Sequence, residues 1–209
     1  MSKKIKDLLK QAEQQAQVTP QESSVTCVSR LFESESDAEK FLDTLKEKLL
    51  RIKEWSEKSG LSSYELFDEN GNLSHRKQAI VGDFIRIALH GSGKYDWVKI
   101  LDITDAPDEI VLTVKPFFDP TEKEIDESTT SHFFTSDATN NFCVEREGNT
   151  INFCVIGLSE KTNTEQTTGI VETIRNFATA NIGSYFGVQK SVWKTFCENF
   201  LETKIVNNG

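Results

Sequence analysis

The sequence predicts an α+β domain built on a curved antiparallel sheet, with a long helix after the first strand and a C-terminal helix packed on the sheet. Three observations lead to this fold class. An apolar stripe at helical spacing runs through residues 36–59, strand-like alternation recurs between residues 82 and 157, and a second helical stripe spans residues 170–200. Each alternating segment has one polar face, which antiparallel sheets tolerate because one of their faces can be solvated.

The chain length is that of one domain. A chain of 209 residues buries roughly 70% of its unfolded surface on folding, so no disulfide or metal is needed for its stability. We expect an amphipathic helix and linker over residues 1–22, a single α+β domain over residues 23–203, and a short tail over residues 204–209.

The overall charge restricts the kinds of partner. The formal net charge is −9, which repels nucleic acid and anionic lipid. No apolar run reaches the length of about 18 residues that a membrane-spanning helix needs, and the N-terminal segment lacks the apolar core of a signal peptide. We therefore expect an acidic cytoplasmic protein that neither binds nucleic acid nor inserts into a membrane.

The N-terminal residues 3–17 are predicted to form a short amphipathic helix that ends before Pro20. Its apolar face has two interpretations. In the first, the helix docks on the protein's own domain or frays. In the second, the helix binds a protein partner, as amphipathic helices do in apolar grooves. The candidate partner contacts on this face are Ile5, Leu8, Leu9 and Ala12.

The next elements are a strand and the long helix. Residues 24–32 alternate and are rich in strand-forming side chains. Ser36 and Glu39 have the spacing of a capping box, and Gly60 occupies the position of a left-handed C-cap. The pattern predicts one uninterrupted helix over residues 36–59.

Three alternating segments follow, at residues 82–91, 95–104 and 109–118. The first places Ile85, Ile87 and Leu89 on one face. Arg86 is the charged residue within this pattern, and it either reaches solvent or anchors a ligand carboxylate.

The turn HGSGKYDW at residues 90–97 has glycines followed by a lysine, as a phosphate-binding loop does. However, Ala88 stands where that loop needs its first glycine, and Tyr95 stands where it needs serine or threonine. A strand follows Lys94 instead of the helix whose N-terminus would face the phosphates. We interpret the segment as a turn between two strands.

Residues 140–157 predict a hairpin with Gly148 and Asn149 as its loop. In that register Cys143 lies opposite Cys154, and the buried face carries Phe142, Val144, Phe153 and Val155. The sequence has four cysteines without CxxC spacing and without a nearby histidine, so we expect no metal and no cofactor. In a reducing compartment we expect all four, Cys27, Cys143, Cys154 and Cys197, to be thiols.

A polar loop at residues 159–169 precedes the closing helix, which we expect to kink or break between Gly183 and Gly187. The acidic segment at residues 119–129 is expected to be a solvated loop, with contact to a protein partner as the alternative.

This order of elements resembles the helix-grip fold of the START-like superfamily, which includes lipid-transfer and polyketide-cyclase-like proteins. The resemblance covers residues 23–203 and rests on the positions named above. The single long helix and the interrupted closing helix depart from that family's pattern. Residues 131–164 are also loosely similar to uncharacterised bacterial proteins of the Bacteroidetes type, a similarity that implies no function.

The START-like resemblance implies a cavity between sheet and closing helix that takes a hydrophobic molecule or lipid. The candidate lining residues are Ile85, Ile87, Leu89, Phe142, Val144, Phe153 and Phe177, with Arg86 and His132 as candidate polar residues. The alternative is that the apolar residues fill a dry core.

The sequence favours a non-enzymatic binding protein with such a cavity, and the main alternative is a subunit or adaptor of a bacterial assembly. No nucleophile motif is present, so no catalytic residue is assigned. An enzyme built in the same cavity, using His132 or Arg86, is the third hypothesis.

Overall fold

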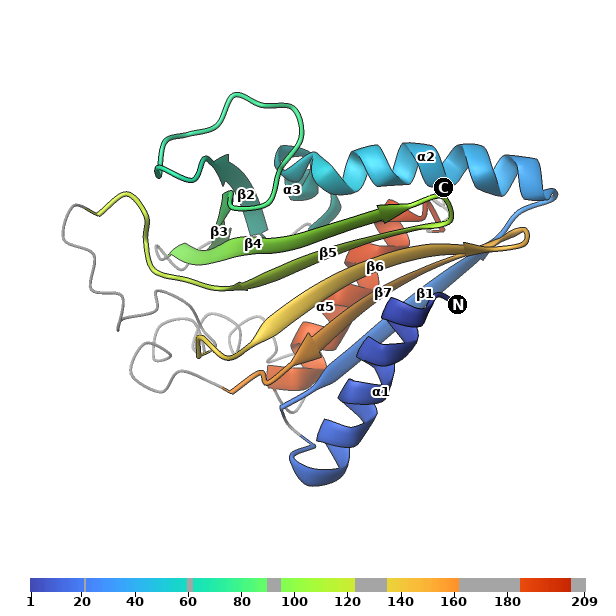
Figure 1. Ribbon diagram of the computed structural model, residues 1–209, viewed down its shortest axis with the longest axis horizontal. Helices are drawn as coiled ribbons and strands as arrows, with labels where there is room; N and C mark the ends of the chain where they lie inside the picture. Colours follow the sequence, from blue (N-terminus) through green and yellow to red (C-terminus); the bar gives the residue numbers. More distant parts are fainter. Residues whose placement is uncertain (21, 60–61, 90–94, 123–134, 162–184, 204–209) are drawn as a thin grey trace, which may run out of the picture.

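The computed structural model describes residues 1–20, 22–59, 62–89, 95–122, 135–161 and 185–203 (Figure 1). Its centre is a seven-stranded sheet in the order β1-β7-β6-β5-β4-β3-β2, with every neighbouring pair antiparallel. The strands are β1 (Ser24–Leu31), β2 (Ser62–Phe67), β3 (Phe84–Leu89), β4 (Tyr95–Ala106), β5 (Glu109–Pro116), β6 (Thr139–Glu147) and β7 (Thr150–Leu158). The predicted α+β class and antiparallel sheet are confirmed, and β2 is an additional strand that the sequence analysis missed.

Helices cover both faces of the sheet (Figure 1). The face called inner here packs against α2 (Glu35–Leu50), α3 (Trp55–Ser59) and α5 (Tyr185–Phe200). The opposite, outer face packs against α1 (Lys3–Val18). The part of the closing helix predicted over residues 170–182 lies outside the described residues, and the described α5 continues through Gly187.

The predicted single helix over residues 36–59 is corrected. The helix begins earlier, because the Ser34 side chain caps it by accepting a hydrogen bond from the Asp37 N–H. It ends at Leu50 with Arg51 as its C-cap, and a 3₁₀ turn, η1 (Ile52–Glu54), leads into α3. The break leaves carbonyls of the last α2 turn without helical partners, and the indole Nε1 of Trp55 donates to one of them, on Leu49, at 3.0 Å.

The hairpin of β6 and β7 has the predicted register. Glu147 pairs with Thr150 and Cys143 pairs with Cys154. Gly148 has a φ of +61°, which glycine adopts without steric cost. Phe142, Val144, Phe153 and Val155 all lie in the inner core, as predicted.

The N-terminal helix α1 lies on the outer face of its own domain. Ile5 and Ala12 are buried there against Val111, Cys143 and Ile156, and Leu8 and Leu9 pack beside them. Polar contacts hold both helix ends: Ser2 N–H donates to Glu145 at 3.1 Å, and Gln15 bonds to Ser159. Binding a partner through the same apolar residues would require α1 to leave the sheet.

One ion pair makes the docking of α1 depend on pH. Lys4 donates to the carboxylate of Asp102, which lowers the pKa of Asp102 below its ordinary value of 3.8. A lowered folded-state pKa means that this contribution is present above the ordinary value and is lost as pH falls through the lowered value. We expect the backbone amides of α1 to exchange faster at pH 3 than at pH 6, after correction for intrinsic rates.

Asp102→Asn is the control for this prediction. It should show weaker protection of α1 at pH 6 and a smaller loss of protection on acidification, because the ion pair with Lys4 is already absent. An equal pH dependence in the wild type and the variant, measured by hydrogen exchange, would contradict the role of Asp102.

Candidate functional site

The predicted apolar lining residues of the inner face are brought together. Ile85, Phe142, Val144 and Phe153 are buried in one cluster with Phe196 of α5. Ile87 faces the same side and is half-buried at its edge. For Leu89 the structure describes the backbone, which pairs with Ser62. Phe177 and His132 lie outside the described residues.

Arg86 does not line this space, so its predicted position is corrected. Because side chains alternate along a strand, Arg86 points to the outer face while Ile85 and Ile87 point inward. Its guanidinium pairs with Glu65 and lies 4.5 Å from the centroid of the Tyr95 ring. Arg86 also covers the rings of Phe67 and Trp97, which form a small outer cluster with Phe84.

Aromatic rings fill the deep part of the space between sheet and α5. Ring centroids of Trp55 and Phe142 are 4.9 Å apart, and those of Phe153 and Phe200 are 5.5 Å apart. These four side chains are at most 2% exposed. This end of the inner face is a packed core.

The next part of the inner face contains buried polar atoms that have no hydrogen-bond partner among the described residues. Trp193 of α5 is half-buried and packs its ring 5.4 Å from that of Phe142. Among the described residues, neither Trp193 Nε1 nor the hydroxyl of the buried Thr26 has a hydrogen-bond partner. Thr26 pairs in register with Val155, and Val155 with Phe142, so these three residues form one row beneath α5.

A polar row follows along the same three strands. Ser24 pairs with Gly157, and Gly157 with Asn140. The Asn140 amide donates to Glu160 at 2.8 Å, and both side chains are buried. A Cβ on Gly157 would lie 2.2 to 2.4 Å from the Glu160 carboxyl group, so glycine is what allows this carboxylate to fold over the strand. The inner face therefore changes from aromatic to polar along α5.

This polar row was not predicted from the sequence. A glycine inside a strand signals the close approach of another group, and Gly157 is such a glycine. Predicting the row would also have required the pairing of β1 with β7, which brings Ser24 and Thr26 of β1 beside the β7 strand that carries Gly157.

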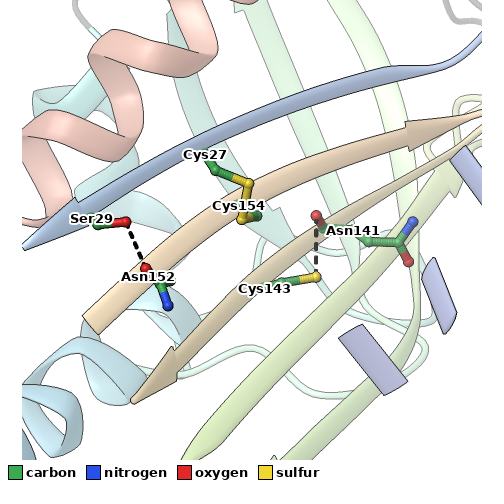
Figure 2. Close-up of a disulfide and its surroundings, with 6 residues drawn as sticks. All are labelled: Cys27, Ser29, Asn141, Cys143, Asn152 and Cys154. Atoms are coloured by element: carbon green, nitrogen blue, oxygen red, sulfur yellow. Dashed lines mark hydrogen bonds between the residues drawn. A yellow bond between two sulfur atoms is a disulfide. The ribbon is translucent and has the colours of Figure 1, made fainter. Parts of the chain in front are cut away.

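The outer face carries a row of cysteines. Cys27 and Cys154 form a disulfide with their Cα atoms 4.1 Å apart (Figure 2), which corrects the expectation that both are thiols. Cys143 and Cys197 are free and buried, as expected. Burial raises the pKa of the Cys143 thiol to about 12 and raises the pKa of Cys197 as well. Within the described ranges, no cluster of His, Cys, Asp and Glu has an arrangement that could hold a metal.

The geometry defines a helix-grip-like α+β protein, with a curved antiparallel sheet and a C-terminal helix on its inner face. The chain is similar to the hypothetical protein jhp0584 from Helicobacter pylori, with a TM-score of 0.53 and 8% sequence identity, covering 88% of this chain and 86% of that chain. This likeness shows a common fold alone.

Two further structures match less well. Ginseng major latex-like protein 151 from Panax ginseng has a TM-score of 0.39 and 12% identity, covering 88% of this chain and 99% of that chain. The extracellular domain of PknH from Mycobacterium tuberculosis has a TM-score of 0.38 and 12% identity, covering 74% and 57%. No family model and no curated protein matches the chain.

Among the helices in the described part of the chain, none is both long and apolar enough to cross a membrane.

Proposed function

We propose that the protein binds a small hydrophobic molecule or lipid between the inner face of the sheet and α5, without catalysis. The observation that carries the proposal is the pair of buried polar groups beneath α5, Trp193 Nε1 and the Thr26 hydroxyl, which lack partners among the described residues. A buried donor without a partner costs about 1–3 kcal/mol, which a dry core would have to absorb. A bound molecule with an oxygen acceptor would remove that cost.

The surroundings of these two groups fit such a molecule. Trp193 faces the inner side and is only half-buried, whereas the rings deeper in the core are closed off. Apolar side chains with a few polar groups are the usual lining of ligand sites. We therefore place the apolar part of the ligand beside the ring of Trp193, and its acceptor toward Trp193 Nε1.

The proposal is tested with 1-anilinonaphthalene-8-sulfonate, an aromatic probe whose sulfonate oxygens accept hydrogen bonds. We expect saturable binding, measured by probe fluorescence, and a Kd raised about 2- to 10-fold by Trp193→Phe, which keeps a ring but removes the donor. Thr26→Val, which keeps the shape, is expected to act in the same direction.

Ile80→Ser is the matched control, since Ile80 is 50% exposed in the loop between β2 and β3 and is not part of the inner core. Its Kd should equal that of the wild type. Unsaturable probe binding, or Trp193→Phe and Thr26→Val both binding as tightly as the wild type, would refute the site.

The redox state of two cysteines can test the predicted cellular compartment. The sequence predicts the cytoplasm, where glutathione keeps thiols reduced, whereas disulfides persist in oxidising compartments. The redox state of Cys27 and Cys154 in cells, measured after rapid acid quenching and alkylation, therefore reports the compartment. Thiols at both positions would support the cytoplasm, and a disulfide would support an oxidising compartment.

A further inference from the structure

Three cysteines lie side by side on the outer face, one on each of three neighbouring strands. Cys154 on β7 is directly opposite Cys27 on β1 and directly opposite Cys143 on β6. Figure 2 shows the disulfide between Cys27 and Cys154, with the Cys143 side chain on the neighbouring strand. Cys154 therefore has two cysteine neighbours and is bonded to one of them.

The backbone geometry brings both neighbours within disulfide range. A Cα separation of 4.1 Å is typical of a pair without backbone hydrogen bonds between its members. Because the hydrogen-bonding side alternates along an antiparallel strand, Cys154 directs its backbone groups to β6 and forms a hydrogen-bonded pair with Cys143. Such pairs have Cα atoms about 5.5 Å apart, close to the commonest separation in disulfides.

We propose that these three cysteines form a thiol–disulfide exchange site in which Cys154 changes its partner from Cys27 to Cys143. The Cys143 thiolate attacks Sγ of Cys154, the Cys143–Cys154 bond forms, and the Cys27–Cys154 bond breaks. Cys27 leaves as a thiolate and takes up a proton equivalent to the one that Cys143 released. One disulfide and one thiol are present before and after, so no oxidant or reductant is consumed.

Helix α1 controls access to this site. Ile5 and Ala12 pack against Cys143 and Cys154, and the thiolate of Cys143 is disfavoured by this burial. The charged groups that face Cys143 are Glu145 and Glu109, which also disfavour the thiolate, and Lys4 of α1, which favours it. Because only a thiolate attacks a disulfide, exchange is slow while α1 is docked and fast once α1 lifts and water reaches the sulfur.

Exchange changes which strand is covalently held. The Cys27–Cys154 bond ties the edge strand β1 to the sheet, whereas a Cys143–Cys154 bond would join two strands that already share a hairpin turn. Strand β1 contributes Arg30, which donates to the carbonyl of Leu201 just after α5 at 2.7 Å. Strand β1 is therefore held more firmly against α5 when Cys154 is bonded to Cys27 than when it is bonded to Cys143.

The first test uses Cys27→Ser, in which Cys154 has Cys143 as its remaining neighbour. After oxidation with glutathione disulfide, peptide mapping without reduction is expected to find the Cys143–Cys154 disulfide in most molecules. Cys27→Ser combined with Cys143→Ser is the control and should lack any intramolecular bond to Cys154. Cys154 found as a thiol or only as a glutathione adduct in Cys27→Ser would overturn the proposal.

The second test keeps all cysteines and loosens α1 with Ile5→Glu. Iodoacetamide at pH 9 is expected to label Cys27 as exchange releases it, at least about tenfold faster in this variant than in the wild type, because the attacking thiol is solvated. Cys197→Ser should leave the wild-type rate unchanged, since Cys197 lies in the inner core. Label on Cys143 alone, with none on Cys27 in either chain, would overturn the proposal.

Discussion

Replacing Trp55 with alanine is expected to lower the free energy of unfolding by about 3–5 kcal/mol, the usual cost of removing a large buried aromatic side chain. Trp55, the first residue of α3, is 2% exposed and its ring lies against β6 and α5. Its ring centroid is 4.9 Å from that of Phe142 and 5.3 Å from that of Phe196. Truncation would leave a cavity where the helices and the sheet meet. Urea unfolding followed by circular dichroism measures the loss.

Trp55→Phe separates packing from hydrogen bonding. It keeps an aromatic ring but leaves the buried carbonyl of Leu49 without the indole donor, a loss of about 1–3 kcal/mol. The expected order of stability is wild type, then Trp55→Phe, then Trp55→Ala. Equal stability of Trp55→Ala and the wild type would mean that this cluster does not hold the helices to the sheet.

Reduction of the Cys27–Cys154 disulfide is expected to lower the free energy of unfolding by about 2–5 kcal/mol. The two cysteines are 127 residues apart, so the bond closes a long loop and restricts the unfolded chain strongly. Urea unfolding with and without a phosphine reductant measures the difference. The Cys27→Ser, Cys143→Ser double variant should not respond to the reductant. A wild-type transition unchanged by full reduction would contradict the prediction.

The hairpin of β6 and β7 could be predicted in full because its information is local. The Gly148–Asn149 turn sets the register, and a register shift of one residue would move Phe142 and Phe153 to the other face. The fold class followed from the same kind of pattern, since each strand alternates within its own segment.

The break at Arg51 could not be predicted from periodicity. Leu49, Ile52 and Trp55 continue the apolar stripe across it, and all three are buried. What ends the helix is the tertiary packing of Trp55 beneath α5, together with its hydrogen bond to Leu49. The sequence shows that these three residues are apolar. It does not show that Ile52 and Trp55 reach the core only when the helix stops and a turn redirects the chain.

The polar row, and Cys27 as the third member of the cysteine row, were missed for a different reason. Both depend on the pairing of β1 with β7, which brings Cys27 to Cys154 and Ser24 to Gly157. Strand faces can be read from alternation, but the choice of neighbour between distant strands has no local signal. The chemistry of both faces therefore became visible only with the sheet order.

The same pairing has a consequence for biosynthesis. Strand β1 leaves the ribosome before its partner β7, which is made more than a hundred residues later, as is α5, which packs on the inner face of the sheet. Contacts this distant in sequence slow folding, because the chain must close a long loop before they form. Until β7 emerges, the nascent N-terminal segment has neither its sheet nor its cysteine partner. The β1 edge is therefore expected to be the last part of the sheet to assemble.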